Sequence, residues 1–126
     1  MILVDTSVWI DHLRHGVARL AELLEQGQVI AHPYVRGELA CGALRQREQI
    51  LGGLADLPQA VVADDKEVLQ LIEQHQLMGR GIGYIDAHLL AAVMLSAGAR
   101  LWTRDRRLQQ CAVALGLNFD DRHEQG

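Results

Sequence analysis

The sequence predicts a three-layer α/β/α sandwich with a central parallel sheet of four to five strands. Short runs of apolar residues alternate along the chain with longer segments in which apolar residues recur at helical spacing. Strands that are apolar throughout are typical of parallel sheets, because helices cover both faces of such a sheet. The length of 126 residues predicts one domain, residues 1–126, that needs no disulfide or structural metal to fold.

The first half of the chain alternates apolar runs with helical segments. The predicted strands cover residues 2–4, 29–31 and 60–62, and the predicted helices cover residues 7–14, 17–26, 33–42 and 45–54. Within the second helix, Leu20, Leu23 and Leu24 fall on one stripe, which is the pattern of a helix with one buried face. Pro33 suits the first position of the third helix, because that position needs no N–H donor.

The second half opens with an amphipathic helix predicted for residues 64–78, which a glycine loop at residues 79–83 follows. The next predicted helix, residues 84–97, is almost wholly apolar, so we expect it to be buried. A strand at residues 100–102, a helix at residues 106–115 and a further short strand at residues 117–119 complete the predicted order.

Composition and charge exclude several classes of protein. Hydrophobic residues at 49% and charged residues at 22% argue against a disordered or fibrous chain. No apolar run approaches the roughly 20 residues of a membrane span, and the acidic start predicts no signal peptide. The net charge of −4 excludes nucleic-acid binding through bulk positive charge, but not through a local patch or metal ions. The 2 cysteines are too few for a disulfide framework, which favours a reducing, cytoplasmic location.

Four acidic residues lie after the predicted strands or near the start of the helices beside them. Asp5 comes directly after the first strand, and Asp105 follows the strand at residues 100–102. Asp86 starts the apolar helix, and Glu38 lies in the helix after the second strand. In open parallel sheets, ligands bind beyond the carboxyl ends of the strands. We therefore expect the four carboxylates to converge at one end of the sheet.

Each acidic residue also has a purely structural interpretation. Asp5, Asp86 and Asp105 stand where they could cap a helix or favour its dipole, and Glu38 could be a solvated surface residue. Glu38 and Asp86, however, lie in apolar helices, where a charge is usually paired or metal-bound. The sequence leaves both interpretations open.

Four neighbouring carboxylates predict a divalent metal site. Such a cluster repels itself and would partly protonate unless cations neutralise it, and oxygen-only ligation suits Mg²⁺ or Mn²⁺. One ion, or two ions about 4 Å apart, could then hold the attacking and leaving oxygens of a phosphodiester. The expected reaction is hydrolysis by a metal-activated water, with a 5′-phosphate and a 3′-hydroxyl as products and no covalent protein nucleophile.

Hydroxyl and arginine side chains stand beside this acidic set. The hydroxyls of Thr6, Ser7 and Thr103 could hold a metal-bound water or a phosphate oxygen, or act as ordinary turn and cap groups. For Ser7 we favour the cap. Residues 100–107 contain four arginines against a single acid. The arginines that could bind RNA phosphates, or else form ion pairs or solvated helix starts, are Arg104, Arg106 and Arg107, together with Arg80 in the glycine loop.

Two further reactive residue types are expected to be structural. His88 lies two residues after Asp86, points elsewhere on the helix and is interpreted as a buried histidine with its hydrogen bonds satisfied. Cys41 follows Glu38 by one turn and is interpreted as a small core residue, not as a nucleophile.

Four segments in order carry a resemblance to a known family. They are residues 2–10 (ILVDTSVWI), 36–39 (RGEL), 83–92 (GYIDAHLLAA) and 101–108 (LWTRDRRL), in a stretch that runs from residue 2 to about residue 119. Together they resemble the PIN-domain ribonucleases and, more narrowly, the VapC-type toxins of toxin–antitoxin pairs. The resemblance implies a PIN-like fold and a Mg²⁺-dependent endoribonuclease whose acidic set is Asp5, Glu38, Asp86 and Asp105. It also implies an RNA substrate, a homodimer and a small antitoxin whose tail occupies the active-site groove.

Two other functions use similar sequence features. A phosphoacceptor domain of the receiver type also has strand-end aspartates, but its chemistry needs a lysine after a late strand. The only lysine here, Lys66, opens a helix in the middle of the chain. A non-catalytic nucleic-acid-binding PIN module is the other alternative, and the loss of one or more carboxylates would favour it. All four carboxylates are present.

Overall fold

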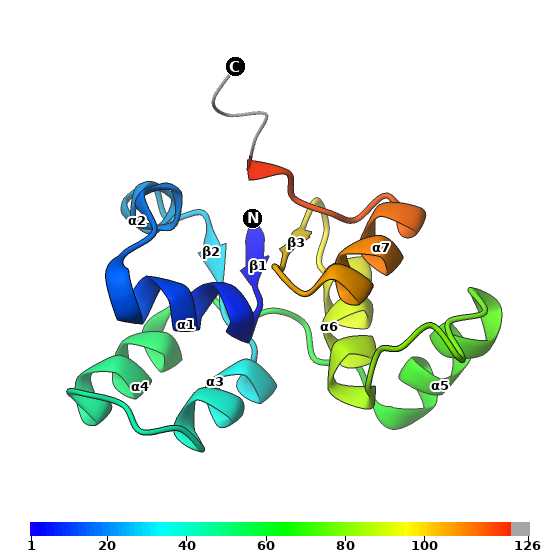
Figure 1. The fold of residues 1–126 in the computed structure, drawn as a ribbon. Coiled ribbons are helices and arrows are strands. Elements are labelled where there is room, and N and C mark those ends of the chain that lie inside the picture. Colours follow the sequence, from blue (N-terminus) through cyan, green and yellow to red (C-terminus); the bar gives the residue numbers. More distant parts are fainter. Residues whose placement is uncertain (122–126) are drawn as a thin grey trace.

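The computed structural model describes residues 1–121, which form a small parallel sheet covered by helices (Figure 1). The elements in chain order are β1 (Ile2–Val4), α1 (Thr6–His15), α2 (Ala18–Glu25), β2 (Val29–Ile30), α3 (Pro33–Ala40), α4 (Arg47–Asp56), α5 (Asp65–Gln74), α6 (Tyr84–Leu95), β3 (Arg100–Trp102) and α7 (Arg106–Leu115).

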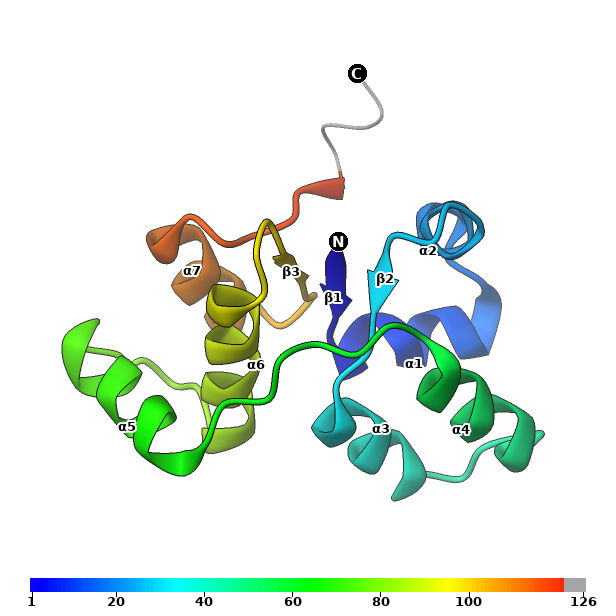
Figure 2. The ribbon, with the colours of Figure 1, turned by 180° about the vertical axis from the view of Figure 1, so that it is seen from behind.

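The sheet has the strand order β2-β1-β3, and both pairs of neighbouring strands are parallel. Leu3 in the central strand stands opposite Ile30 on one side and Leu101 on the other, and all three side chains are buried. Helices α1 to α4 lie on the β2 side of the molecule and α5 to α7 on the β3 side, as Figures 1 and 2 show from opposite directions. The predicted α/β sandwich with a parallel sheet is confirmed.

The predicted number of strands is too high for residues 1–121. The expected strand at residues 60–62 forms no bridge, although Gln59 just before it forms a single parallel bridge with Ala31. The expected strand at residues 117–119 contributes a single parallel bridge, Leu101 with Asn118. Beyond the first bridge the chain leaves the sheet, because the Val61 N–H donates to Ser96 Oγ (3.1 Å) instead of to β2. The sheet therefore has three strands, extended by one bridge at each edge.

The predicted helices are present with shifted limits. Pro33 occupies the first turn of α3, as expected, and α5 begins with a capping box in which Asp64 accepts from the Glu67 N–H at 2.7 Å. Helix α6 was expected to be buried over its whole length, which is wrong at its ends. Its centre is buried, but Tyr84 is 45% exposed and Leu95 44% exposed. No helix within residues 1–121 has the length and apolar character needed to cross a bilayer.

One apolar cluster links the sheet to the helices. Trp9 and Trp102 both belong to this cluster and are buried. Cys41, which was interpreted as a core residue, is instead exposed at the end of α3. The buried side of α3 carries Val35 and Leu39, which are four residues apart, so the position of Cys41 lies off that stripe.

Candidate active site

The carboxyl ends of β1 and β3 form the floor of the candidate active site. The Asp5 N–H donates to the Trp102 carbonyl at 2.9 Å, which ties the two strand ends together just where Asp5 and Thr103 follow them. Glu38 comes to this edge on α3, Asp86 on the first turn of α6, and Asp105 at the start of α7. The fold thus brings residues from four separate parts of the chain to one end of the sheet.

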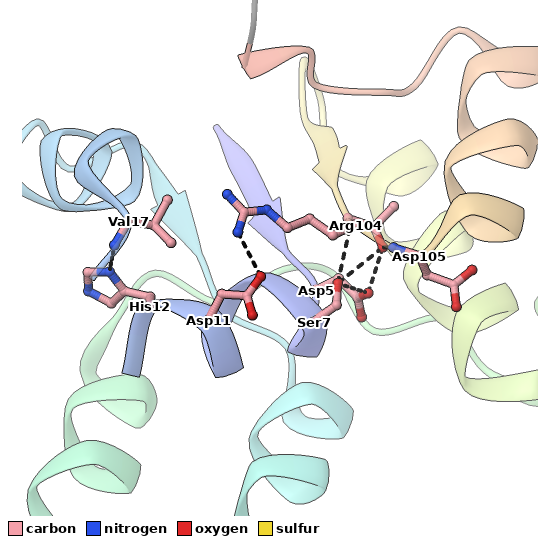
Figure 3. Close-up of polar contacts among 8 residues, drawn as sticks. Asp5, Ser7, Asp11, His12, Val17, Arg104 and Asp105 are labelled. Atoms are coloured by element: carbon pink, nitrogen blue, oxygen red, sulfur yellow. Dashed lines mark hydrogen bonds and ion pairs between the residues drawn. The ribbon is translucent and has the colours of Figure 1, made fainter. Parts of the chain in front are cut away.

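Hydrogen bonds fix the buried carboxylate of Asp5 in place (Figure 3). Its Oδ2 accepts from Thr103 Oγ1 at 2.7 Å and from Ser7 Oγ at 2.9 Å. Both hydroxyls are fixed in turn, because Ser7 Oγ accepts from the Arg104 N–H and Thr103 Oγ1 from the Asp105 N–H, each at 3.0 Å. The side chain of Asp5 therefore has a single, well-supported orientation.

The other three carboxylates are each held by one oxygen. Thr6 Oγ1 donates to Glu38 Oε1 at 2.8 Å, across 32 residues of sequence. The Gly83 N–H donates to Asp86 Oδ2 at 3.2 Å, and the Leu108 N–H donates to Asp105 Oδ1 at 3.0 Å. Within residues 1–121, the second oxygen of each of the four carboxylates accepts no hydrogen bond. One oxygen orients each side chain, and the other remains available to a ligand.

The charges of the other three acidic residues act on Asp86. Partial burial is the largest cause that raises the pKa of Asp86 above its ordinary value, and the negative charges of Asp5, Asp105 and Glu38 raise it further. The hydrogen bond from Gly83 opposes these effects. Asp86 is therefore the carboxylate on which burial and the charge of the cluster act together.

The geometry shows which of the acidic residues also have the structural roles considered from the sequence. Asp105 does cap α7, and Asp86 accepts from the N–H at the start of α6, so both acids also have the structural role considered for them. Asp5 stands at the cap position of α1 but makes no side-chain cap bond. The cap expected for Ser7 is wrong, because its hydroxyl bonds Asp5 and the Arg104 N–H instead of the helix.

The arginines near the site differ in their partners. Arg104 pairs with Asp11 of α1 at 2.7 Å (Figure 3), a partner that sequence reasoning missed because it lies 93 residues away. The hydrogen bond from Arg104 is the main cause that holds the pKa of Asp11 below its ordinary value. Among the described residues, Arg80, Arg106 and Arg107 form no ion pair.

Two buried histidines contact the ring of Tyr34. His32 caps α3, with its Nδ1 accepting from the Tyr34 N–H at 3.0 Å, and was not singled out from the sequence although it directly precedes Pro33. His88 is buried as expected, between the rings of Tyr34 and Tyr84. The prediction that its hydrogen bonds would be satisfied is wrong, because its Nδ1 has no hydrogen-bond partner within residues 1–121.

We expect His32 to make the protein sensitive to mild acid. Burial, followed by the effect of His88, lowers the pKa of His32 to about 4, whereas an unfolded histidine has its ordinary value of 6.5. The unfolded chain then binds a proton that the folded chain does not, so stability falls as the pH falls from about 6.5 to about 4. Asparagine at this position can still cap the helix but does not titrate. Urea midpoints at pH 7 and pH 5 should therefore differ less for His32→Asn than for the native chain, and equal differences would contradict the assignment.

A groove of about 890 Å³ opens beside Glu38. Its walls come from α1, the end of α3, the following loop and α4, and they include the apolar side chains of Ile10, Leu13, Leu44 and Ile50. A second depression, about 710 Å³ along α5, includes none of the four carboxylates. Of these two hollows, only the groove includes one of the four carboxylates, Glu38.

The donor set of the acidic edge fits a hydrated magnesium-type ion. Within residues 1–121, no three His, Cys, Asp or Glu side chains meet closely enough to hold one ion directly. Mg²⁺ does not require such a cage, because it usually keeps several waters and binds through one or two carboxylates and the phosphates of a substrate. The free oxygens of Asp5, Glu38, Asp86 and Asp105 are donors of this kind.

Comparison with known proteins gives the family. Residues 2–114 match the family model of the PIN domain. The chain is also 51% identical over 117 residues to Ribonuclease VapC32 of Mycobacterium tuberculosis, in strain CDC 1551 / Oshkosh and in strain H37Rv, covering 93% of this chain and 94% of each relative. Together with the parallel sheet and the acidic residues at its carboxyl edge, these matches show that this chain belongs to the PIN-domain family, in its VapC group.

Proposed function

We propose that this protein is a metal-dependent endoribonuclease that acts as the toxin of a type II toxin–antitoxin pair. The observation that supports this most directly is the arrangement of Asp5, Glu38, Asp86 and Asp105, each with one oxygen fixed by a hydrogen bond and one oxygen free. The 51% identity to a protein named a ribonuclease supports RNA as the substrate class.

The proposed cofactor is Mg²⁺ or Mn²⁺, held among the same four carboxylates with retained waters as its remaining ligands. Such an ion, when bound, activates the attacking water and stabilises the charge on the leaving 3′ oxygen. The chain itself contributes orientation. Asp5 is held by Ser7 and Thr103, and Glu38 by Thr6, so these hydroxyls restrict the orientations that the two carboxylates can take. Thr6, Ser7 and Thr103 are thus proposed as residues that position the acidic set.

Phosphate binding is assigned to arginines that surround the acidic edge. Arg80, Arg104, Arg106 and Arg107 are exposed on or beside the segments that carry Asp86 and Asp105. Their charges would offset the repulsion between RNA and the carboxylates, and guanidinium groups match phosphate geometry well.

Metal removal tests the proposal. The purified native chain is expected to cleave RNA in Mg²⁺ or Mn²⁺, and excess EDTA should reduce the rate to background until Mg²⁺ is restored. Gel assays with total cellular RNA measure this, with Asp5→Asn protein purified in the same way as the control for contaminating nuclease. Cleavage that persists in EDTA, or that the Asp5→Asn preparation matches, would contradict the proposed function.

The proposed partners are a cognate antitoxin and a second copy of the chain. The groove beside Glu38 has both apolar and basic side chains in its walls, among them Leu13, Ile50 and Arg45, which suits the tail of an antitoxin. The exposed ends of α6 supply apolar surface for a homodimer. An adjacent upstream reading frame that encodes a small DNA-binding protein would support the first partner, and sedimentation of the purified chain tests the second. We place the protein in the cytoplasm, in keeping with its two free cysteines, Cys41 and Cys111.

The two alternative functions have less support. A receiver-type phosphoacceptor needs a lysine beside its aspartates, but Lys66 lies on α5, along the depression that contains none of the four carboxylates. A non-catalytic PIN module would bind RNA without cutting it. The metal-dependent cleavage assay distinguishes both alternatives from the proposed nuclease.

A further inference from the structure

Arg107 lies against a glycine of the loop that leads to Asp86. A β-carbon at Gly81 would stand 2.5 Å from Arg107 Cδ and 2.9 Å from its Nη1, closer than side-chain atoms approach one another. Gly81 also has φ at +82°, a conformation that side chains disfavour. Because Gly81 has no side chain, the Arg107 side chain can extend along its backbone.

This contact connects the two segments that carry Asp86 and Asp105. The loop that contains Gly81 ends at Gly83, whose N–H bonds Asp86, and Arg107 lies two residues after Asp105 in the first turn of α7. Helices α6 and α7 lie side by side in both ribbon views (Figures 1 and 2). The Arg107 side chain thus contacts the loop that leads to Asp86 while its backbone belongs to the helix that Asp105 caps.

Arg107 differs in this respect from Arg104. The guanidinium of Arg104 already pairs with Asp11, so a phosphate would have to replace a carboxylate there. Within residues 1–121, Arg107 is exposed and forms no ion pair. A phosphate that binds Arg107 displaces only water and mobile ions, which gives the full gain from counterion release.

We propose that Arg107, whose side chain extends along Gly81, binds a backbone phosphate of an RNA strand that reaches the acidic edge. This inference rests on the proposed function, since it assumes that the RNA reaches the four carboxylates. Binding of a phosphate at this point fixes the strand between the segments of Asp86 and Asp105. It specifies a contact with the RNA backbone rather than with a base, so it acts on any single-stranded sequence.

RNA binding by matched variants tests this proposal. The probe is a fluorescein-labelled single-stranded RNA of about 20 nucleotides with randomised sequence, and anisotropy is measured in Mg²⁺ over a range of salt, with every protein carrying Asp5→Asn to prevent cleavage. We expect Arg107→Gln to weaken binding about tenfold and to reduce the salt slope by about 0.7, the contribution of one single-strand phosphate. Arg104→Gln should reduce the slope less. Lys66→Gln, the charge control on α5, should change neither quantity.

The glycine loop supplies a second control. Gly79 and Gly81 both have positive φ, at +71° and +82°, but a β-carbon at Gly79 meets no atom within 4 Å. We therefore expect Gly81→Ala to weaken RNA binding, Gly79→Ala to have no such effect, and Gly81→Ala to add nothing in an Arg107→Ala background. The inference would be overturned if Gly81→Ala and Gly79→Ala weakened RNA binding equally, or if Gly81→Ala weakened it further in the Arg107→Ala background. It would also be overturned if Arg107→Gln bound RNA as tightly as Lys66→Gln does. Failure of the chain without Asp5→Asn to cleave RNA would instead count against the proposed function.

Discussion

Asp5→Asn is expected to reduce RNA cleavage at least about 100-fold while the protein stays folded. The asparagine carbonyl can occupy the place of Oδ2 and still accept from Thr103 and Ser7, so the network at the ends of β1 and β3 survives. The amide nitrogen then replaces Oδ1, the oxygen that accepts no hydrogen bond within residues 1–121. A donor NH₂ group cannot ligate a cation, so the loss falls on metal binding.

Three measurements separate this effect from unfolding. Initial cleavage rates in Mg²⁺ report activity, thermal melting reports the fold, and calorimetric titration with Mn²⁺ reports metal affinity. Thr103→Val is the matched comparison, because it removes one of the hydroxyls that orient Asp5 but none of the carboxylates. We expect it to reduce activity less than Asp5→Asn does. An Asp5→Asn protein with native activity and native Mn²⁺ affinity would rule out Asp5 as a ligand.

Asp86→Asn is expected to reduce RNA cleavage about as much as Asp5→Asn does. Unlike a typical substitution, it should also raise the melting temperature of the metal-free protein. Burial and the three neighbouring carboxylates raise the pKa of Asp86, so its charged form costs folding free energy at neutral pH. Asparagine removes that charge and still offers an oxygen to the Gly83 N–H. The variant should therefore gain stability where a typical substitution loses it.

The stability gained by Asp86→Asn should depend on pH. The pKa of Asp86 in the folded chain lies above the unfolded value of 3.8, so the folded chain binds a proton there more readily than the unfolded chain does. As the pH falls through the folded pKa, Asp86 becomes neutral and its charge no longer lowers the stability of the native chain. The advantage of Asp86→Asn should thus be present at pH 7 and fade as the pH approaches 4. Melting curves in EDTA at several pH values measure it, with Glu73→Gln on the exposed face of α5 as the control carboxylate. A native chain that is more stable than Asp86→Asn at pH 7 would indicate that the acids do not repel one another.

Part of this fold follows directly from local sequence patterns. The alternation of apolar runs with helical stripes was enough to predict an α/β sandwich, and Pro33 marked the start of α3 correctly. The edges of the sheet were not predictable in the same way. Residues 60–62 are as apolar as a strand, but the Val61 N–H finds Ser96 on α6, which a local window of sequence does not contain.

In the candidate site, too, some features could be predicted from the sequence and others could not. Asp5 and Asp105 follow strands, and the strand direction alone places them at one edge of a parallel sheet. How each carboxylate is held could not be predicted, because Thr6 reaches Glu38 across 32 residues and Thr103 reaches Asp5 across 98. Ser7, assigned to a cap, became part of this network for the same reason.

The order of apolar and acidic residues along the chain was thus enough to predict a layered parallel fold with four acids near its carboxyl edge. These features follow from backbone periodicity, which each segment expresses locally. Tertiary packing decided which oxygen of each acid is fixed, which arginine is paired with Asp11 and which one lies against Gly81. Those contacts join atoms whose distance depends on how whole helices pack, and the free energy that selects them arises only once the sheet and helices are together.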